Sequence, residues 1–326
     1  KSCHNISWED DYSWVHQENI LEVLKDGSKL LPEVKKYLEE ENEYTKKQLS
    51  ETKPMQKRLF NEIKARIKLD DESLPYKDKN YEYWTKVTKE GDYSKKLRKK
   101  IGDNKIETYW DGDIEAKGKK FFNTGDIAVS HNDELLAYSI DDKGSEYFTI
   151  FVRKISDNKI IEEPIPNTAG GITWSYDDKY FFYSKLDTFH RPRQIFTHKL
   201  GTSIKEDRLV FEEKNDRFTC GIGTSSDEQF YFVSTSEHTT SEVYYFNKNE
   251  IKPELKIILK RKEGVQYSLD SWDGYFWMHT NQNAKDFKIL RCKHDNINKW
   301  EDYIPAKEET LIGGFVLLNN WMVRSE

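Results

Sequence analysis

The side chains that could do covalent chemistry are scattered along this chain and form no recognisable catalytic set. A hydrolase nucleophile needs a serine on a strained turn between a strand and a helix, which is encoded as G-x-S-x-G. No such motif occurs, and residues 223–227 (Gly-Thr-Ser-Ser-Asp) lack the closing glycine. We therefore interpret Ser225 as a turn residue and expect no catalytic residue in this chain. The eight histidines receive no role as a general base, because no nucleophile accompanies them.

Sites for cofactors and metals are not indicated either. Residues 112–120 resemble a phosphate-binding loop, but the spacing is one residue too long and the lysine is followed by Lys120 instead of Ser or Thr. His190 and His198 are eight residues apart and have no acidic or thiol partner at the spacing of metal ligands. We predict neither a cofactor nor a metal.

Residues 191–193 (Arg-Pro-Arg) concentrate positive charge beside a proline. One interpretation is a charged loop that fixes the register between two strands. The other interpretation places Arg191 against a substrate or a neighbouring domain, and on that basis Arg191 is the candidate substrate-binding residue. The pairs 141–142 and 177–178 (both Asp-Asp) are interpreted as turn formers.

The composition indicates a folded protein with a heavily charged surface. Of the 326 residues, 34% are charged and 14% are aromatic, and the formal net charge is −6. Basic and acidic residues are interspersed, without the basic stripe that nucleic-acid-binding proteins carry, so we predict no nucleic-acid partner. No apolar run approaches the roughly 18 residues that a membrane helix needs, which predicts no membrane association.

The cysteines predict the cellular compartment, and the first residue bears on where the natural chain begins. Cys3, Cys220 and Cys292 are far apart and odd in number, which excludes a disulfide framework and favours a reducing compartment. We therefore expect a cytoplasmic protein. The sequence opens with Lys1 instead of Met, and we expect the natural start to lie upstream.

The elements that would position such residues begin with helices. From Pro32, apolar residues recur at helical spacing, and Pro32 itself suits the first turn of a helix. A second helix is predicted from about Pro54, with Thr52 as a possible N-cap. We expect residues 1–70 to form an N-terminal helical arm.

Residues 71–326 repeat a pattern of short strands and turns. Each copy has an apolar position, a serine, a polar turn that contains Asp, and an apolar strand that closes on Ser. The copies begin at Ile127, Ile172 and Ile222, which are 45 and 50 residues apart. A degenerate copy follows at Asp273, and another begins at Trp321.

Two further strands recur between these copies. The first recurs at 147–152, 194–198, 242–246 and 287–290, and the second at 159–161, 208–211 and 256–259. Three to four short strands in about 45 residues are typical of a β-propeller blade. With a less regular unit at 81–110, the prediction is a mainly β protein: an incomplete propeller of about five four-stranded blades from a larger ring, preceded by the helical arm.

The alternative architecture is a β-solenoid or an array of sandwiches. The rungs of a β-solenoid are shorter than 45 residues, and hairpin-type turns such as 111–112 and 273–274 (both Asp-Gly) disfavour this alternative.

Several segments resemble oligopeptidase B, the trypsin-like branch of the prolyl oligopeptidase family of serine peptidases. Their order and spacing are together more specific than any one of them, and the resemblance runs along the whole chain. The segments are 10–14 (Asp-Asp-Tyr-Ser-Trp), 37–45 (Tyr-Leu-Glu-Glu-Glu-Asn-Glu-Tyr-Thr), 66–75 (Arg-Ile-Lys-Leu-Asp-Asp-Glu-Ser-Leu-Pro), 141–150 (Asp-Asp-Lys-Gly-Ser-Glu-Tyr-Phe-Thr-Ile), 190–192, 198–202 and 240–243.

This resemblance implies that the chain is the front part of a longer enzyme. Members of the family continue into an α/β-hydrolase domain, on which the N-terminal helices pack, while the propeller caps the active site. The resemblance further implies that short peptides are admitted and cut after Lys or Arg, so that short basic peptides and the missing hydrolase domain are the expected partners. The chain alone is expected to be inactive.

A second hypothesis is a stand-alone propeller that acts as a binding module, since function does not follow from fold. The incomplete ring argues against it, because open blades leave sheet edges unpaired. A third hypothesis is a decayed remnant without function.

Overall fold

The computed structural model describes residues 2–250 and 253–326, and the chain divides into two compact units. The first unit runs to Phe122 and also includes Asp142–Ser145. The second unit comprises Asn123–Asp141 and Glu146–Glu326. Strands outnumber helices and contain more residues than the helices do, so the predicted mainly β class is confirmed. The predicted boundary after residue 70 stays a prediction.

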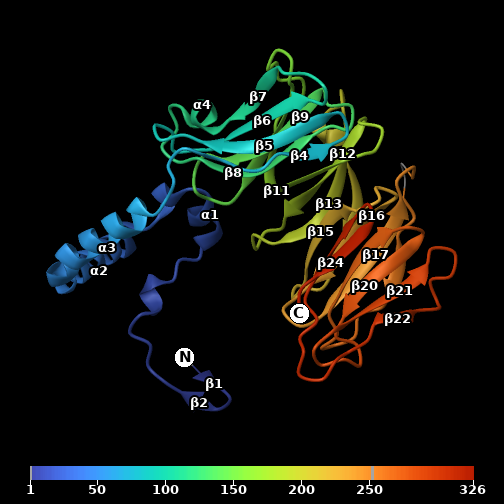
Figure 1. Ribbon diagram of the computed structural model, residues 1–326. Helices are drawn as coiled ribbons and strands as arrows, with labels where there is room; N and C mark the ends of the chain where they lie inside the picture. The colour runs from blue at the N-terminus through green and yellow to red at the C-terminus, as the bar shows by residue number, and fades with distance from the viewer. Residues whose placement is uncertain (1, 251–252) are drawn as a thin grey trace. The chain divides into compact units, whose positions relative to one another are not determined.

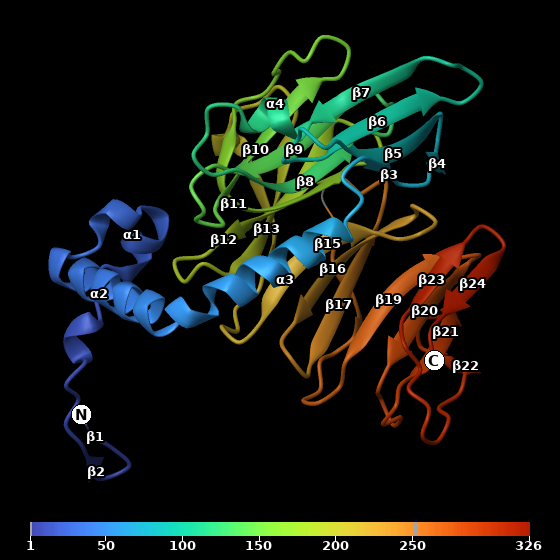
Figure 2. The same cartoon turned by 60° about the vertical axis from the view of Figure 1, so that its left-hand side comes forward.

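The α-helices of the described residues lie in the first unit, and the two longest confirm the predicted helical segments. Pro32 occupies the first turn of α2, where its missing N–H costs no hydrogen bond. Figures 1 and 2 show α2 and α3 meeting at the short η3 turn. The helices of the first unit are η1 (Ser13–Val15), α1 (Ile20–Lys25), η2 (Gly27–Lys29), α2 (Pro32–Gln48), η3 (Ser50–Thr52), α3 (Lys53–Ala65) and α4 (Gly112–Ala116), and the short η4 (Ile204–Glu206) lies in the second unit.

The apolar side chains of α2 and α3 are largely uncovered. Val34 is the buried residue of α2, and α3 has none. Phe60 and Ile63 of α3 each expose 61% of their surface. Exposed apolar side chains at helical spacing mark a face that is suited to contact with another surface.

Two details of the expected local structure need correction. Thr52 is the N-cap residue of α3, as predicted, but its side chain makes no capping hydrogen bond, and its hydroxyl donates instead to the Leu49 carbonyl at 2.7 Å. The segment Asp111-Gly112 is no hairpin turn, because Asp111 is the N-cap of α4 and its Oδ1 accepts the N–H of Asp113 at 3.2 Å. An Asp that precedes Gly suits either role, and the local sequence does not separate the two.

A five-stranded antiparallel sheet completes the first unit, in the region where a less regular unit was predicted. Strands β3 and β4 both pair with β5, β5 pairs with β6, and β6 pairs with β7. Trp110 is 2% exposed, and the Tyr83 and Tyr109 rings meet edge-on at 5.7 Å. The strands are β3 (Asp71–Glu72), β4 (Tyr76–Asp78), β5 (Tyr81–Val87), β6 (Lys95–Lys100) and β7 (Ile106–Asp111), besides the hairpin of β1 (Ser2–Cys3) and β2 (Ile6–Ser7).

The second unit consists of antiparallel sheets in chain order (Figure 1). Seven strands, β8 to β14, form one sheet, and two four-stranded sheets and a hairpin follow. The strands of the first sheet are β8 (Asn123–Val129), β9 (Leu135–Asp141), β10 (Phe148–Lys154), β11 (Ile165–Trp174), β12 (Tyr180–Leu186), β13 (Pro192–Lys199) and β14 (Arg208–Glu212). The others are β15 (Thr219–Thr224), β16 (Phe230–Ser236), β17 (Ser241–Asn247), β18 (Lys256–Leu259), β19 (Tyr267–Trp272), β20 (Tyr275–Thr280), β21 (Lys288–Lys293), β22 (Glu301–Ile304), β23 (Phe315–Leu318) and β24 (Trp321–Arg324).

The repeat found in the sequence is confirmed as a recurring hairpin. The three clear copies form β8–β9, β11–β12 and β15–β16, and the degenerate copy falls on β19–β20. In β19–β20 the two-residue turn Asp273-Gly274 has positive φ at both positions, as a tight hairpin requires. Residues 159–161 were expected to form a strand, but only Ile160 makes an isolated bridge, to Arg153.

β11 takes the place of that missing strand. Its first half pairs with β10, where Ile165 lies opposite Ile150, and its second half pairs with β12, where Trp174 lies opposite Phe181. The register shifts between the halves, at a segment where Gly170 has a φ of +92°. Two groups of strands that the repeat would separate are therefore joined into one sheet.

Carboxylates bind the serine turns to the neighbouring hairpins. Asp178 accepts the N–H groups of His131 at 2.6 Å and of Asn132 at 2.8 Å. Asp270 likewise accepts the N–H and the hydroxyl of Ser226, at 2.8 and 2.6 Å. The predicted role of Asp178 in a turn is confirmed, and the same side chain also links two turns.

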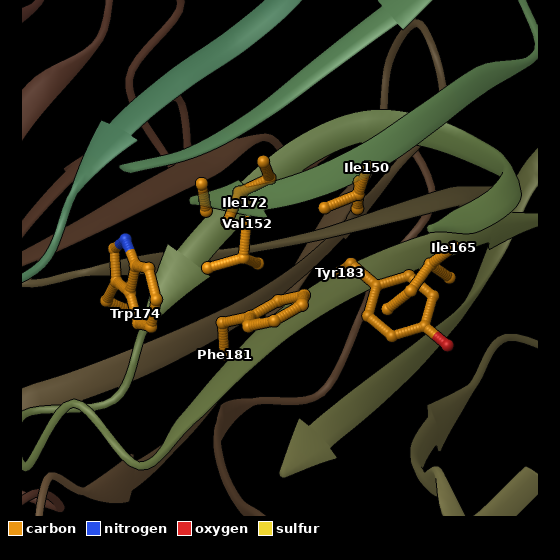
Figure 3. Close-up of a cluster of buried hydrophobic side chains, with 8 residues drawn as sticks. Ile150, Val152, Ile165, Ile172, Trp174, Phe181 and Tyr183 are labelled. Atoms are coloured by element: carbon orange, nitrogen blue, oxygen red, sulfur yellow. The ribbon is translucent and has the colours of Figure 1, made fainter. Parts of the chain in front are cut away.

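The core of the second unit is built from the inward faces of these strands. Figure 3 shows side chains of β10, β11 and β12 pointing toward one another, with Trp174 and Phe181 in contact at 5.7 Å between ring centroids. A second cluster centres on Phe276, which is fully buried against Phe230 and Tyr245. Alternating aromatic and β-branched residues fit such half-buried pleated surfaces.

Candidate functional site

The loop between β12 and β13 carries the candidate Arg191 and is held tightly by Asp187. The Asp187 carboxylate accepts the N–H groups of Phe189 at 2.8 Å and of Arg191 at 3.0 Å. His190 adopts a φ of +64° to close the turn, and its ring meets the Tyr147 ring edge-on at 4.4 Å. The loop therefore presents Phe189, which is 69% exposed, and Arg191 at its tip.

The two arginines of the Arg-Pro-Arg group have different surroundings. Arg191 is exposed, and its guanidinium donates to the Asp216 carbonyl. Arg193 is partly buried and donates from Nε and Nη2 to the Glu213 carbonyl, at 3.0 and 2.7 Å. Arg191, in the β12–β13 loop, and Arg193, at the start of β13, thus both bind the β14–β15 loop. These contacts fix loop structure, and the outer position of Arg191 leaves its side chain accessible to solvent.

Next to this loop lies an ionic cluster centred on Arg261. Its Nη2 contacts Glu213 Oε2 at 2.6 Å and Glu242 Oε2 at 2.7 Å, and both carboxylate side chains are nearly buried. The guanidinium also lies over the Phe218 ring, at 4.1 Å from the centroid. Sequence reasoning missed this cluster, because its members are separated by up to 48 residues and come from β17 and from the segments that follow β14 and β18.

The electrostatics of the cluster follow from opposite charges in close contact. Burial disfavours the charged form of each group. The hydrogen bonds and charges of Glu213 and Glu242 nevertheless raise the pKa of Arg261 above its ordinary value. The same contacts lower the pKa of the Glu242 carboxyl, although burial acts in the other direction. Arg261 and Glu242 are therefore both held in their charged forms at neutral pH.

A more exposed set of charges lies beside it. Arg217 reaches Glu263 at 3.2 Å and Glu237 at 3.8 Å. Hydrogen bonds from the Thr239 and Thr240 hydroxyls lower the pKa of Glu237 to about 2. Fixed charges of both signs surround the Arg191 loop, and such a surface can orient a charged ligand but cannot supply a nucleophile.

The structure places Ser225 in a turn, as predicted. Its hydroxyl donates to Asp227 Oδ1 at 2.7 Å and accepts the N–H of Phe230 at 3.0 Å. His190 and His198 do not come together, and among residues 2–250 and 253–326 no group of three or more His, Cys, Asp or Glu side chains is placed to hold a metal. The His198 ring contacts two carboxylates that the sequence spacing did not indicate, Asp207 and Glu162.

A small pocket lies between the β11–β12 turn and residues 248–250. It measures about 110 Å³, and Tyr176, Phe182 and Tyr231 are among its lining residues. The Lys248 ammonium lies over the Tyr176 ring at 4.0 Å. This volume is well below the roughly 300 Å³ at which small-molecule sites begin, so the pocket does not fit a peptide.

Comparison with known proteins gives the family. A model of the N-terminal β-propeller domain of prolyl oligopeptidase matches residues 1–326, which is the whole chain. The chain belongs to the prolyl oligopeptidase family. The resemblance that the sequence motifs indicated is thereby confirmed.

Two curated relatives are considerably longer than this chain. Dipeptidyl aminopeptidase BI of Pseudoxanthomonas mexicana is 28% identical over 100% of this chain and 46% of its own length. Protease 2 of Moraxella lacunata is 25% identical over 94% of this chain and 44% of its own length. The chain therefore spans about half the length of these relatives.

Solved structures of the prolyl oligopeptidase family share the fold. Oligopeptidase B from Leishmania major superposes with a TM-score of 0.86 at 25% identity, over 97% of this chain and 44% of that protein. Oligopeptidase B from Trypanosoma brucei, in a closed form with covalently bound antipain, has a TM-score of 0.84 at 24% identity. In the described part of this chain, no helix has the length and apolar character needed to span a bilayer.

Proposed function

We propose that this chain is the substrate-gating, N-terminal part of a serine-type oligopeptidase that cleaves short peptides after Lys or Arg. The proposal rests on one observation: the propeller-domain model of the family covers the whole chain, while the chain covers about half of each curated relative. The catalytic groups then belong to an α/β-hydrolase domain elsewhere in the complete protein, which we propose to be cytoplasmic. The chain by itself is inactive on this proposal.

The strand groups are proposed to be blades of a larger propeller. The sheet of β3 to β7, the two halves of the β8–β14 sheet, and the sheets β15–β18 and β19–β22 supply about five blades. The β23–β24 hairpin then begins the next blade. A ring of stacked blades has a narrow central channel, which admits extended peptides and excludes folded proteins.

The helical arm, residues 1–70, is proposed to pack on the hydrolase domain. Support comes from its uncovered apolar residues: Leu38, Leu59, Phe60 and Ile63 are each more than 40% exposed. An apolar stripe of this length along α2 and α3 is costly in water and gains free energy when another domain covers it.

The specificity for basic residues is tested with the complete protein. We would measure kcat/KM for fluorogenic peptides that differ only in the residue before the scissile bond: Arg, Lys, Pro or Ala. The proposal expects Arg and Lys to be preferred by at least about 100-fold, because a site built for a charged group rejects neutral analogues strongly. Equal cleavage after Pro, or release of N-terminal dipeptides only, would contradict it.

Arg191 is proposed to face the substrate or the hydrolase domain from its loop tip. Its exposed guanidinium, held at one end by Asp216, supports this placement. In the complete enzyme, Arg191→Ala is expected to raise KM severalfold, whereas Arg191→Lys, which retains the charge, keeps part of the effect. Unchanged turnover and unchanged melting of Arg191→Ala would leave only the register-fixing role.

A further inference from the structure

A buried histidine in β13 is enclosed by two carboxylates. His198 is fully buried, and its Nδ1 lies 2.7 Å from Asp207 Oδ1 while its Nε2 lies 3.5 Å from Glu162 Oε2. The side chains of Asp207 and Glu162 are 1% and 7% exposed. Both ring nitrogens thus face an acceptor, in a place that water barely reaches.

The two carboxylates are held by further donors. Asp207 Oδ2 accepts the Tyr183 hydroxyl at 2.6 Å. Glu162 accepts the Gly201 N–H at 2.9 Å. Three segments therefore meet at His198: the connection before β11, which carries Glu162; strand β12, which carries Tyr183; and the connection to β14, which carries Asp207.

Donor and acceptor counts decide the protonation state. A neutral imidazole has one N–H, so it can donate to only one of the two carboxylates. The other carboxylate would then face a nitrogen lone pair, which is repulsive at low dielectric. A doubly protonated ring donates to both and halves the excess negative charge of the cluster.

We propose that His198 is a pH-sensitive clasp: as an imidazolium it holds the Glu162 segment against the β12–β14 strands, and it releases that segment when it loses a proton in alkaline solution. The Glu162 segment is the connection between the two halves of the seven-stranded sheet. Release therefore loosens the passage from β10 to β11. This inference is independent of the proposed peptidase function.

The electrostatic balance around the ring agrees with this assignment. Burial by itself lowers the pKa of His198, but the hydrogen bonds and charges of Asp207 and Glu162 outweigh burial and raise it. A group whose pKa is raised on folding stabilises the fold fully below its unfolded pKa, about 6.5 for His. That contribution is lost as the pH rises through the higher pKa of the folded state.

The decisive experiment is an NMR titration of the ring nitrogens in the full 326-residue chain labelled with ¹⁵N-histidine. The His198 signals are identified by their absence in His198→Gln. We expect both nitrogens to remain protonated at pH 7.5, because the two carboxylates raise the pKa of the ring above its ordinary value. A neutral ring at pH 7 would overturn the proposal.

Matched variants separate the clasp from a general effect of charge. Glu162→Gln keeps an acceptor but removes one charge, so the midpoint should fall by about one unit or more. Glu163→Gln removes the charge of the exposed neighbouring glutamate and should change nothing. Hydrogen exchange of the Gly201 amide, corrected for intrinsic base catalysis, should become faster at pH values above the titration midpoint of His198. Equal midpoints in both variants, or exchange at Gly201 that ignores the midpoint, would contradict the clasp.

Discussion

Replacing Arg261 by methionine would leave two nearly buried carboxylates without their counterion. In the wild-type structure the guanidinium contacts Glu213 and Glu242 at 2.6 and 2.7 Å, and one quarter of its side chain is exposed. Methionine preserves most of the apolar length of arginine, so the lost interactions are mainly electrostatic. The change therefore isolates the cost of burying unpaired negative charge.

The expected magnitude follows from burial. Removing one partner of a buried ion pair costs about 3–5 kcal/mol. The partial exposure of Arg261 moderates this figure, and loss of the contact with the Phe218 ring adds about 0.5–1 kcal/mol. We expect the free energy of unfolding to fall by about 3 kcal/mol at pH 7, which is a large part of the stability of an ordinary domain.

The stability loss of Arg261→Met should depend on pH in a defined direction. In the wild type the pKa of Glu242 is lowered, so its contribution is present above its unfolded pKa and is lost as the pH falls. In Arg261→Met the two carboxylates repel each other, their pKa values rise, and protonation relieves the strain. Urea unfolding followed by circular dichroism should therefore show the difference between variant and wild type shrinking from pH 7 to pH 4.5.

Two controls make this prediction refutable. Arg66→Met removes an exposed ion pair with Glu62 and should cost no more than about 0.5 kcal/mol. Arg261→Met combined with Glu242→Gln should recover part of the loss. A cost below about 1 kcal/mol for Arg261→Met, or a cost that does not depend on pH, would refute the reasoning.

Two further predictions concern packing and thiol reactivity. A methyl group at Gly125 would lie 2.5 and 2.8 Å from neighbouring side-chain atoms, so Gly125→Ala should lower the free energy of unfolding by about 1–3 kcal/mol. A methyl group at Gly221 meets nothing within 4 Å, so the control Gly221→Ala should change stability by no more than about 1 kcal/mol. Equal melting temperatures of the two variants would disprove the packing argument. Burial raises the pKa of Cys220 and of Cys292 to about 12, so at pH 8 a thiol reagent should label exposed Cys3 promptly and the other two only in denaturant. Labelling of all three thiols in the native state would contradict this.

The sequence was most informative where one local pattern repeats. Helical spacing after Pro32 and the serine turns at 45- to 50-residue intervals predicted α2 and three hairpins, because these elements depend on neighbours in the chain. The motif order also predicted the family. The loop that carries Arg191 lies between two strands, where the interpretation as a register-fixing loop placed it.

What the sequence did not reveal depends on contacts between distant segments. The His198 cluster draws Glu162 from 36 residues upstream, and the Arg261 cluster draws Glu213 from 48 residues upstream. No local spacing encodes such meetings.

The two halves of the β8–β14 sheet share strand β11, and this has a consequence for local unfolding. Because this strand pairs with β10 at one end and with β12 at the other, neither half of the β8–β14 sheet can unravel without breaking hydrogen bonds of the other. The sheets β15–β18 and β19–β22 have no such common strand. Thermal fluctuation should therefore expose the amides of β8–β14 as a single cooperative block, and those of the later sheets separately, each with its own free energy of opening.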